Sequence, residues 1–158
     1  MDLQLTGKRA LVTGASRGLG YATARTLALE GCQVAINSRS QANLSAAAEK
    51  LSQECGRPVT GLPGDIGLPD VPAALIQQAV QALGGLDLLV TNAGGPPAGK
   101  FEAFDDAAWQ QAVELSLLSH VRLIRAALPA LHQSPAASVL TITSYSVKQP
   151  IANLVLSN

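Results

Sequence analysis

The chain has 158 residues, of which 47% are hydrophobic and 14% are charged. A chain of this length forms one domain with a sizeable core, and the composition excludes a disordered, collagen-like or disulfide-rich protein. The 11 basic residues balance the 11 acidic ones and form no run of like charge, which argues against a nucleic acid or an anionic membrane as partner.

The N-terminus lacks the basic start and apolar stretch of a secretory signal, and no segment approaches about 18 uninterrupted apolar residues. Cys32 and Cys55 have no metal-ligand spacing and no histidine cluster beside them. This favours two reduced thiols, with a disulfide left open as the alternative. We therefore expect a cytoplasmic, soluble protein without a metal site.

The first elements read as strand, helix and strand. Residues 9–13 are a short apolar run closed by Gly14, typical of a buried parallel strand. A helix is expected from Leu19, and Gly31 stands where a left-handed cap would end it. Residues 33–37 are predicted to form the second strand. The predicted inward face of the helix comprises Ala22, Thr23, Thr26 and Leu27.

The same alternation continues through the middle of the chain. Ser40 is a plausible cap for a helix that extends to Leu51, and residues 59–62 predict a third, weaker strand. Asp70 begins the next helix, and residues 86–91 predict the fourth strand. The predicted inward faces of the two helices comprise Leu44, Ala47, Ala48 and Leu51, and Leu75, Ala79 and Leu83.

A long helix is expected from Asp105 to about Leu128, where Pro129 is expected to interrupt it, and residues 138–144 predict a fifth strand. Strands this apolar are not expected to expose either face of the sheet to solvent. The predicted fold class is therefore α/β, a doubly wound parallel sheet with helices on both faces. Ligands collect at the carboxyl ends of such strands. The residues expected to converge there are Gly14, Asp65, Asn92 and Ser144.

The sequence TGASRGLG at residues 13–20 leaves a predicted strand and opens a predicted helix. A loop that needs glycine to bend is the alternative, but this placement directs unpaired backbone N–H groups and the positive helix end to one spot, which suits a pyrophosphate. Gly14 would make the bend, Gly18 would permit close approach, and Gly20 would let the helix pack on the sheet.

The spacing Gly-x-x-x-Gly-x-Gly, together with Asn92-Ala93-Gly94, resembles the short-chain dehydrogenase/reductase family, and most of all its bacterial 3-oxoacyl-[acyl-carrier-protein] reductases. The resemblance implies a Rossmann-type domain over residues 1–158, incomplete at its C-terminus. It also implies hydride transfer to or from a small-molecule or acyl-thioester carbonyl, and a homodimer or homotetramer. The implied cofactor residues are Gly14, Ser16, Arg17, Gly18, Leu19, Gly20, Ser38, Arg39, Asp65, Ile66, Asn92, Ala93 and Gly94.

The residues after the second strand bear on the choice of nicotinamide cofactor. An NAD enzyme usually has a carboxylate there for the ribose hydroxyl, whereas this chain has Asn37-Ser38-Arg39. Arg39 and Arg17 could clamp a 2′-phosphate, so NADP is expected over NAD. The alternative is that both arginines are solvated loop residues. By resemblance, Asp65 and Ile66 flank the adenine.

Catalysis in the family uses a tyrosine to exchange a proton, a lysine to lower its pKa, a serine and a helical asparagine. By resemblance Ser144 matches the serine, and Ser116 stands at the asparagine position. The tyrosine position falls on Ser157, and its lysine would lie beyond Asn158. Tyr145 is expected to be structural. The expected function is an NADP-dependent oxidoreductase, with a non-catalytic nucleotide-binding sensor or assembly partner as the alternative.

Overall fold

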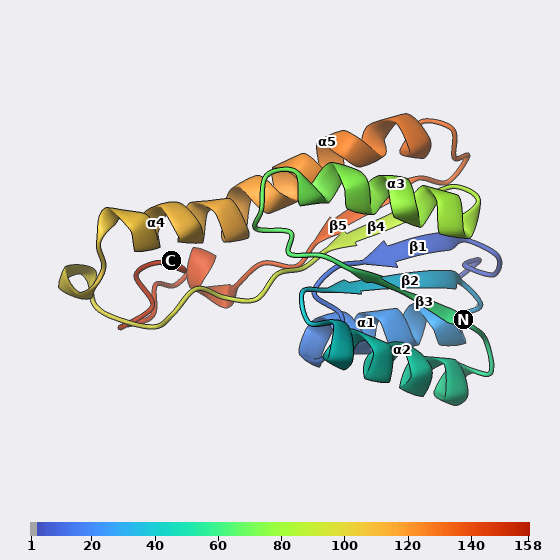
Figure 1. Ribbon diagram of the computed structural model, residues 1–158, viewed down its shortest axis with the longest axis horizontal. Helices are drawn as coiled ribbons and strands as arrows, with labels where there is room; N and C mark the ends of the chain where they lie inside the picture. The colour runs from blue at the N-terminus through green and yellow to red at the C-terminus, as the bar shows by residue number, and fades with distance from the viewer. Residues whose placement is uncertain (1–2) are drawn as a thin grey trace.

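The computed structural model describes residues 3–158 and contains a five-stranded parallel sheet in the order β3-β2-β1-β4-β5 (Figure 1). This is the Rossmann-type order, in which the chain moves outward from β1 in one direction and then in the other. The predicted doubly wound parallel sheet is confirmed. Its strands are β1 (Arg9–Val12), β2 (Gln33–Ser38), β3 (Val59–Pro63), β4 (Leu88–Thr91) and β5 (Ser138–Thr141).

Helices cover both faces of the sheet (Figure 1). One layer holds α1 (Gly18–Leu29) and α2 (Gln41–Cys55), and the other holds α3 (Val71–Leu83) and α5 (Ser119–Leu131). A long helical rod reaches α5 through α4 (Asp106–Val113) and the π-helical turn η2 (Glu114–Leu118). Within residues 3–158, no helix combines the length and the apolar character needed to cross a membrane. Two short 3-10 turns complete the elements, η1 (Phe101–Ala103) and η3 (Tyr145–Val147).

The core consists of two apolar clusters, one on each face of the sheet. Ala24 and Leu44 belong to the cluster under α1 and α2, together with Ile36 from β2. Leu75 and Leu123 belong to the cluster under α3 and α5. All five side chains are fully or almost fully buried. Burial of apolar surface on both faces is what allows the strands to be continuous apolar runs.

The inward face of α1 differs from the sequence prediction. Ala22 and Thr26 are exposed, whereas Gly20, Ala24 and Ala28 face the sheet. These three small residues recur every fourth position, so the helix backbone can approach the strands closely. Of the predicted face, Leu27 packs against the core cluster, whereas the prediction for Ala22 and Thr26 was wrong; the close approach of Gly20 to the preceding turn agrees with the observed rotation of the helix.

The predicted interruption at Pro129 was also wrong, because α5 continues to Leu131. Proline removes one helical hydrogen bond, that to the carbonyl of Arg125. Both residues are exposed, so water can reach that carbonyl. Only about one turn of helix follows, which limits the cost of the distortion.

The fifth strand is shorter than predicted, since β5 ends at Thr141 and not at residue 144. Its four residues are all exposed, with Val139 and Leu140 at 40% and 55%. The expectation that helices cover both faces of every strand therefore fails at this edge. The helix layers lie over the more central strands, and β5 pairs with β4 along one side only.

Candidate functional site

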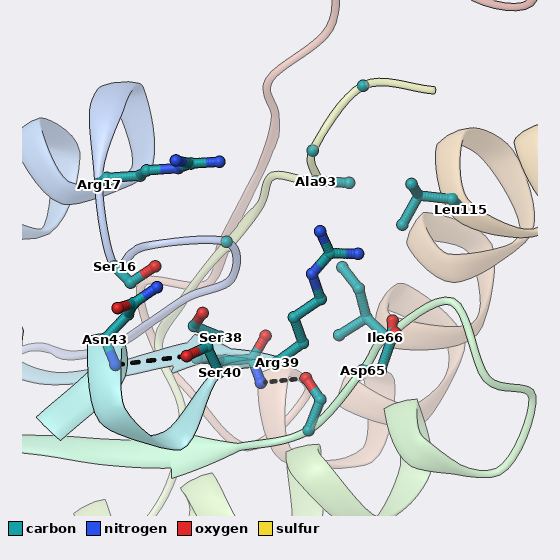
Figure 2. A pocket seen from close by; sticks show the side chains of 15 residues that line it. Ser16, Arg17, Ser38, Arg39, Ser40, Asn43, Asp65, Ile66, Ala93 and Leu115 are labelled. Carbon is teal, nitrogen blue, oxygen red and sulfur yellow. Dashed lines mark hydrogen bonds between the residues drawn. The ribbon is translucent and has the colours of Figure 1, made fainter. Parts of the chain in front are cut away.

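A pocket with a volume of about 230 Å³ lies at the carboxyl ends of the strands (Figure 2). Its lining comes from the end of β2, from the segments that follow β1, β2, β3 and β4, from the first turn of α2 and from η2. In this fold class, strand ends beside the point where strand order reverses are the usual place for a ligand. The lining comprises Gly14, Ser16, Arg17, Asn37, Ser38, Arg39, Ser40, Asn43, Gly64, Asp65, Ile66, Ala93, Gly94, Gly95 and Leu115.

The turn between β1 and α1 depends on glycine for two different reasons. Gly14 has a positive φ of 57°, and a Cβ there would lie 2.7 Å from Nδ2 of Asn92. Gly20 has no positive φ, but a Cβ there would lie 2.5 Å from the carbonyl oxygen of Gly14. Gly18 also has a positive φ, of 60°, yet no atom lies within 4 Å of where its Cβ would be. The turn therefore packs tightly against other protein atoms at Gly14 and Gly20, and it borders open space at Gly18.

The N-terminus of α1 lacks the usual protein partners. Its N-cap residue Arg17 makes no side-chain capping hydrogen bond, and no acidic residue stands in the first turn. The first N–H groups of a helix have no partner within the helix itself. Together with the open space at Gly18, this arrangement fits an anionic group such as a pyrophosphate, which would accept hydrogen bonds from these amides.

Asn92, directly after β4, ties the two central strands together. Its backbone N–H donates to Oγ1 of Thr13 at 2.9 Å, and that hydroxyl donates to the Asn92 carbonyl at 2.7 Å. The carboxamide donates to the carbonyl of Gly14 at 3.0 Å. Asn92 itself does not line the pocket, but the next three residues do. Its contacts hold the glycine turn against β4, whatever the turn binds.

The end of β2 carries the cationic side of the pocket. Asn37 is buried and donates from Nδ2 to the carbonyls of Leu62 and Gly64, both at 3.0 Å, which joins β2 to the end of β3. Ser38 is buried and Arg39 is exposed. Arg17 and Arg39 extend into the pocket from different elements (Figure 2). No carboxylate occupies the end of this strand.

The loop after β3 supplies the pocket's acidic residue and an apolar wall. Oδ1 of Asp65 accepts a hydrogen bond from the backbone N–H of Gly67 at 3.0 Å, which fixes the turn. Ile66 is 5% exposed and belongs to the core cluster under α3 and α5. Both residues line the pocket, opposite Ala93 and Leu115 (Figure 2). An apolar wall of this kind suits an aromatic base.

Ser144 lies outside that lining, at the N-cap of η3. Its Oγ accepts a hydrogen bond from the backbone N–H of Ser146 at 3.1 Å and lies 2.9 Å from Oγ of Ser146. The buried Ser146 hydroxyl also lies 3.0 Å from the carbonyl oxygen of Ser157. Ser146 therefore links Ser144, at the family's serine position, to the backbone of residue 157, at the family's tyrosine position. Residue 157 is a serine in this chain.

Ser116 lies in η2, the π-helical turn that interrupts the long helix. Its side chain is exposed and does not line the pocket, but its neighbour Leu115 does. Extra residues of this kind in a helix occur often at functional sites. The sequence pattern gave no sign of the π turn, because one inserted residue changes the helical period only locally.

Tyr145 lies in η3, after the end of β5, so strand alternation does not set the direction of its side chain. Its side chain is 68% exposed, and its hydroxyl donates to Oε1 of Gln149.

Among residues 3–158, no group of three or more His, Cys, Asp or Glu side chains could hold a metal ion. In the same part of the chain, Cys32 and Cys55 are both free thiols.

The largest pKa perturbation lies at the opposite end of the sheet from the pocket. Asp87, directly before β4, accepts two hydrogen bonds from the Arg9 guanidinium, at 2.8 Å each, and one from Ser134 at 2.6 Å. The Arg9 contact holds the pKa of this carboxyl far below its usual range. In α5, burial lowers the pKa of His120. Both groups affect folding stability rather than the pocket.

Comparison with known proteins decides the family. The model for short chain dehydrogenases matches residues 8–156, which is nearly the whole chain. The chain belongs to the short-chain dehydrogenase family. Ketoacyl reductase HetN from Nostoc sp. (strain PCC 7120) is 35% identical over 94% of this chain, and the uncharacterized oxidoreductase YvrD from Bacillus subtilis is 33% identical over 98%.

Solved structures of family members have the same fold. L-sorbose reductase from Gluconobacter frateurii, in complex with NADPH and L-sorbose, superposes with a TM-score of 0.95 at 29% identity, over 99% of this chain and 60% of that one. The NADH-dependent reductase A1-R′ in complex with NAD gives 0.89 at 28% identity, over 99% and 68%. The family therefore contains structures with either cofactor. The chain spans 51% of HetN and 58% of YvrD.

Several lining residues were absent from the sequence prediction. Asn43 lies in the first turn of α2, only four positions after the predicted Arg39, and helical spacing from the Ser40 cap could have indicated it. Leu115 could not have been found in this way, because the long helix reaches the pocket only in the folded chain. Of the predicted residues, Leu19 is 68% exposed and lies outside the lining, and Gly20 is buried beneath the turn.

Proposed function

We propose that this chain is the cofactor-binding part of an NADP-dependent oxidoreductase that exchanges a hydride with a carbonyl or alcohol substrate. The observation that carries the proposal is the chemistry at the end of β2, where Ser38 and Arg39 stand in place of a carboxylate and Arg17 enters the same pocket. The family membership supports the reaction class, and the pocket supports the cofactor.

The charge of the 2′-phosphate is the basis for the choice of NADP. A phosphate monoester carries about −1.5 to −2 charges at neutral pH and accepts several hydrogen bonds. A guanidinium binds such a group in a planar, bidentate arrangement. NAD has only a hydroxyl at this position, which favours a carboxylate partner. Two arginines therefore favour NADP and offer little to NAD.

The remaining pocket residues suit the other parts of the cofactor. The open N-terminus of α1 beside Gly18 is suited to the pyrophosphate, and Asp65 and Ile66 to the adenine. Ala93 and Gly94, after β4, are suited to the ribose and nicotinamide side. When bound, the nicotinamide supplies or accepts the hydride. The protein's contribution is to bind and orient it.

We propose that Ser144 holds the substrate's carbonyl oxygen by a hydrogen bond from its hydroxyl. A hydroxyl has one hydrogen to donate. If Ser146 donates to Ser144, the Ser144 hydrogen is free for substrate; if Ser146 donates to the carbonyl of Ser157, Ser144 donates to Ser146 instead. Ser116 would assist a proton relay from the π turn. The subtype that we favour is a 3-oxoacyl-[acyl-carrier-protein] reductase-like enzyme acting on a small carbonyl or acyl thioester.

A second function is favoured by one specific observation. Residue 157, at the family's tyrosine position, is a serine, and a serine hydroxyl is a much weaker acid than a phenol. A protein that binds the cofactor without hydride transfer, as a sensor or assembly partner, is consistent with this. The two functions differ in turnover and share cofactor binding.

We also propose a homodimer or homotetramer. Val113, Leu117, Val121 and Leu128 are exposed along the rod formed by α4, η2 and α5, at roughly helical spacing. A stripe of this kind supplies apolar surface for a second copy. Light scattering of the protein and of Val121→Glu would test this, with a loss of mass expected in the variant. A monomeric wild type would contradict it.

The cofactor proposal is tested by calorimetric titration of the full-length protein with NADPH and NADH. Arg39 makes charge-assisted contacts worth about 1.5–3 kcal/mol, so NADPH is expected to bind about 10- to 100-fold more tightly than NADH. Arg39→Glu should abolish that preference. Arg125→Glu, the same change of charge on the exposed side of α5, should retain it.

Turnover is then followed by nicotinamide absorbance against a panel of ketones and acyl thioesters. Turnover supports the enzyme, and binding without turnover supports the non-catalytic alternative. Failure to bind either nucleotide would contradict both functions.

A further inference from the structure

A second cavity, of about 500 Å³, lies between α1 and α2. On α2 its wall is made by positions on one helical face, with the small Ala46 and Ala47 between Asn43 and Lys50. On α1 the wall is the first turn. Gly18 on one side and Ala46 and Ala47 on the other add little bulk, and Tyr21 completes the wall on α1.

The two cavities share one wall. Ser16, Arg17 and Asn43 line the pocket at the strand ends and also the cavity between the helices. A group that extends from the first pocket towards α2 therefore meets these three side chains before any other part of the second cavity. The second cavity contributes no carboxylate to this boundary, since its lining includes none.

Asn43 is fixed in its backbone and free in its side chain. Its backbone N–H donates to Oγ of the N-cap residue Ser40 at 3.4 Å, which anchors the first turn of α2. Its side chain points towards Ser16 (Figure 2). Within residues 3–158 the carboxamide has no hydrogen-bond partner, so its two N–H donors are available at the boundary of the cavities.

The residue type at this position also points to an anion. An acidic residue in the first turn stabilises a helix through the helix dipole, yet the first turn of α2 has none. A neutral amide donor stands where a carboxylate would favour the helix. A carboxylate there would repel an anion held beside Arg17, whereas the carboxamide can donate to it.

We propose that Asn43 is a specificity-determining residue that donates a hydrogen bond to the 2′-phosphate of NADP(H) at the boundary of the two cavities. The inference rests on the proposed cofactor and adds a third contact, from α2, to those of Arg17 and Arg39. NAD lacks the 2′-phosphate to which Asn43 would donate. The side chain at position 43 therefore affects the choice between the two cofactors and leaves the affinity for NAD unchanged.

Lys50 lies on the same face of α2, two turns further along, and has a weaker role. Its side chain is 66% exposed, and its Nζ lies 3.8 Å from a carboxylate oxygen of Glu54. Solvent and this carboxylate reduce its field at the boundary. Lys50→Gln should therefore weaken NADPH binding by less than about threefold, and only at low salt.

The test is Asn43→Asp in the full-length protein, with Gln41→Glu as the matched control. Both variants add one negative charge to the first turn of α2, but Gln41 does not line either cavity. Asn43→Asp should weaken NADPH binding about 10- to 100-fold and change NADH binding by less than about threefold. Gln41→Glu should change both by less than about threefold. Thermal unfolding should show neither variant to be less stable, because both charges favour the helix.

Adenosine 2′,5′-bisphosphate and 5′-AMP separate the phosphate from the rest of the cofactor. Asn43→Asp should weaken the bisphosphate by the same factor as NADPH and leave 5′-AMP unchanged. An equal loss for both cofactors, or an unchanged preference for NADPH, would overturn the role of Asn43 and leave the proposed function intact. A wild type that binds NADPH no better than NADH would overturn the proposed cofactor, and the role of Asn43 with it.

Discussion

Gly20 offers a sharp test of how the glycine turn is built. It lies in α1 with no positive φ, so in an ordinary helix Gly20→Ala would stabilise the fold by about 1 kcal/mol. Here the added Cβ would lie 2.5 Å from the carbonyl oxygen of Gly14 and 2.9 Å from Cα of Ala15. Both atoms belong to the backbone of the turn, which cannot move aside as the end of a flexible side chain can.

The magnitude follows from that contact. Ordinary Cβ contacts begin near 3.4 Å, so the helix and the turn would have to separate by up to about 0.9 Å. Overpacking of this kind costs about 1–3 kcal/mol or more, which exceeds the gain in helix propensity. We therefore expect Gly20→Ala to lower the free energy of unfolding by about 2 kcal/mol and to weaken NADPH binding, because the displaced helix carries the pyrophosphate-binding amides.

Urea unfolding followed by circular dichroism gives the stability, and calorimetric titration gives the affinity. Gly18→Ala is the control, since its φ of 60° brings backbone strain of about 1–2 kcal/mol but no atom lies within 4 Å of the new Cβ. Gly18→Ala should lose less stability than Gly20→Ala. It should still bind NADPH poorly, because the new Cβ would enter the open space beside Gly18 where the pyrophosphate is proposed to bind. A Gly20→Ala protein as stable as the wild type, with unchanged affinity, would refute the close-contact argument.

Three further predictions concern stability. Asp87→Asn should cost about 3 kcal/mol at neutral pH, because it leaves the guanidinium of Arg9 without its carboxylate. Since the folded-state pKa of Asp87 is lowered, that stabilisation is present above about pH 4 and is lost as the pH falls further, so urea titrations should show the gap narrowing below that value. Burial lowers the pKa of His120, so the unfolded chain takes up the proton first as the pH falls, and the free energy of unfolding should decrease below about pH 6.5. His120→Leu should flatten this pH dependence between about pH 7 and 5. An unchanged pH dependence in the variant would show that another group causes it. Ser146→Ala should cost about 1–2 kcal/mol in thermal unfolding, since its buried hydroxyl joins Ser144 to the carbonyl of Ser157, and a neutral change would contradict that link.

Local sequence signals were sufficient for most of the elements. Ser40 was predicted as a cap and Asp105 as the start of a helix, and both side chains accept a hydrogen bond from a backbone N–H three residues on. Gly31 and Gly84 end their helices with positive φ values of 93° and 73°, as expected of glycine. These signals act within one turn of chain, which explains why the sequence reveals them.

The cofactor side of the site was predictable for a related reason. In a parallel sheet, all strands end at the same edge, so the residues after β1, β2 and β3 had to meet there. Gly14, Arg39 and Asp65 line one pocket as a consequence. Ser144 does not join them, because the chain leaves the sheet after Thr141 and its hydroxyl is used in capping η3.

By itself the sequence determined the alternation of strands and helices, the parallel sheet and the glycine turn, because periodicity and turn chemistry are local properties. Only the tertiary structure decided that Gly20, Ala24 and Ala28 face the sheet and that Leu115 of the long helix lines the pocket. Gly20 lies against the turn before the helix, and the long helix that carries Leu115 meets the strand ends only after folding. Such contacts depend on distances in space, which no spacing along the chain records.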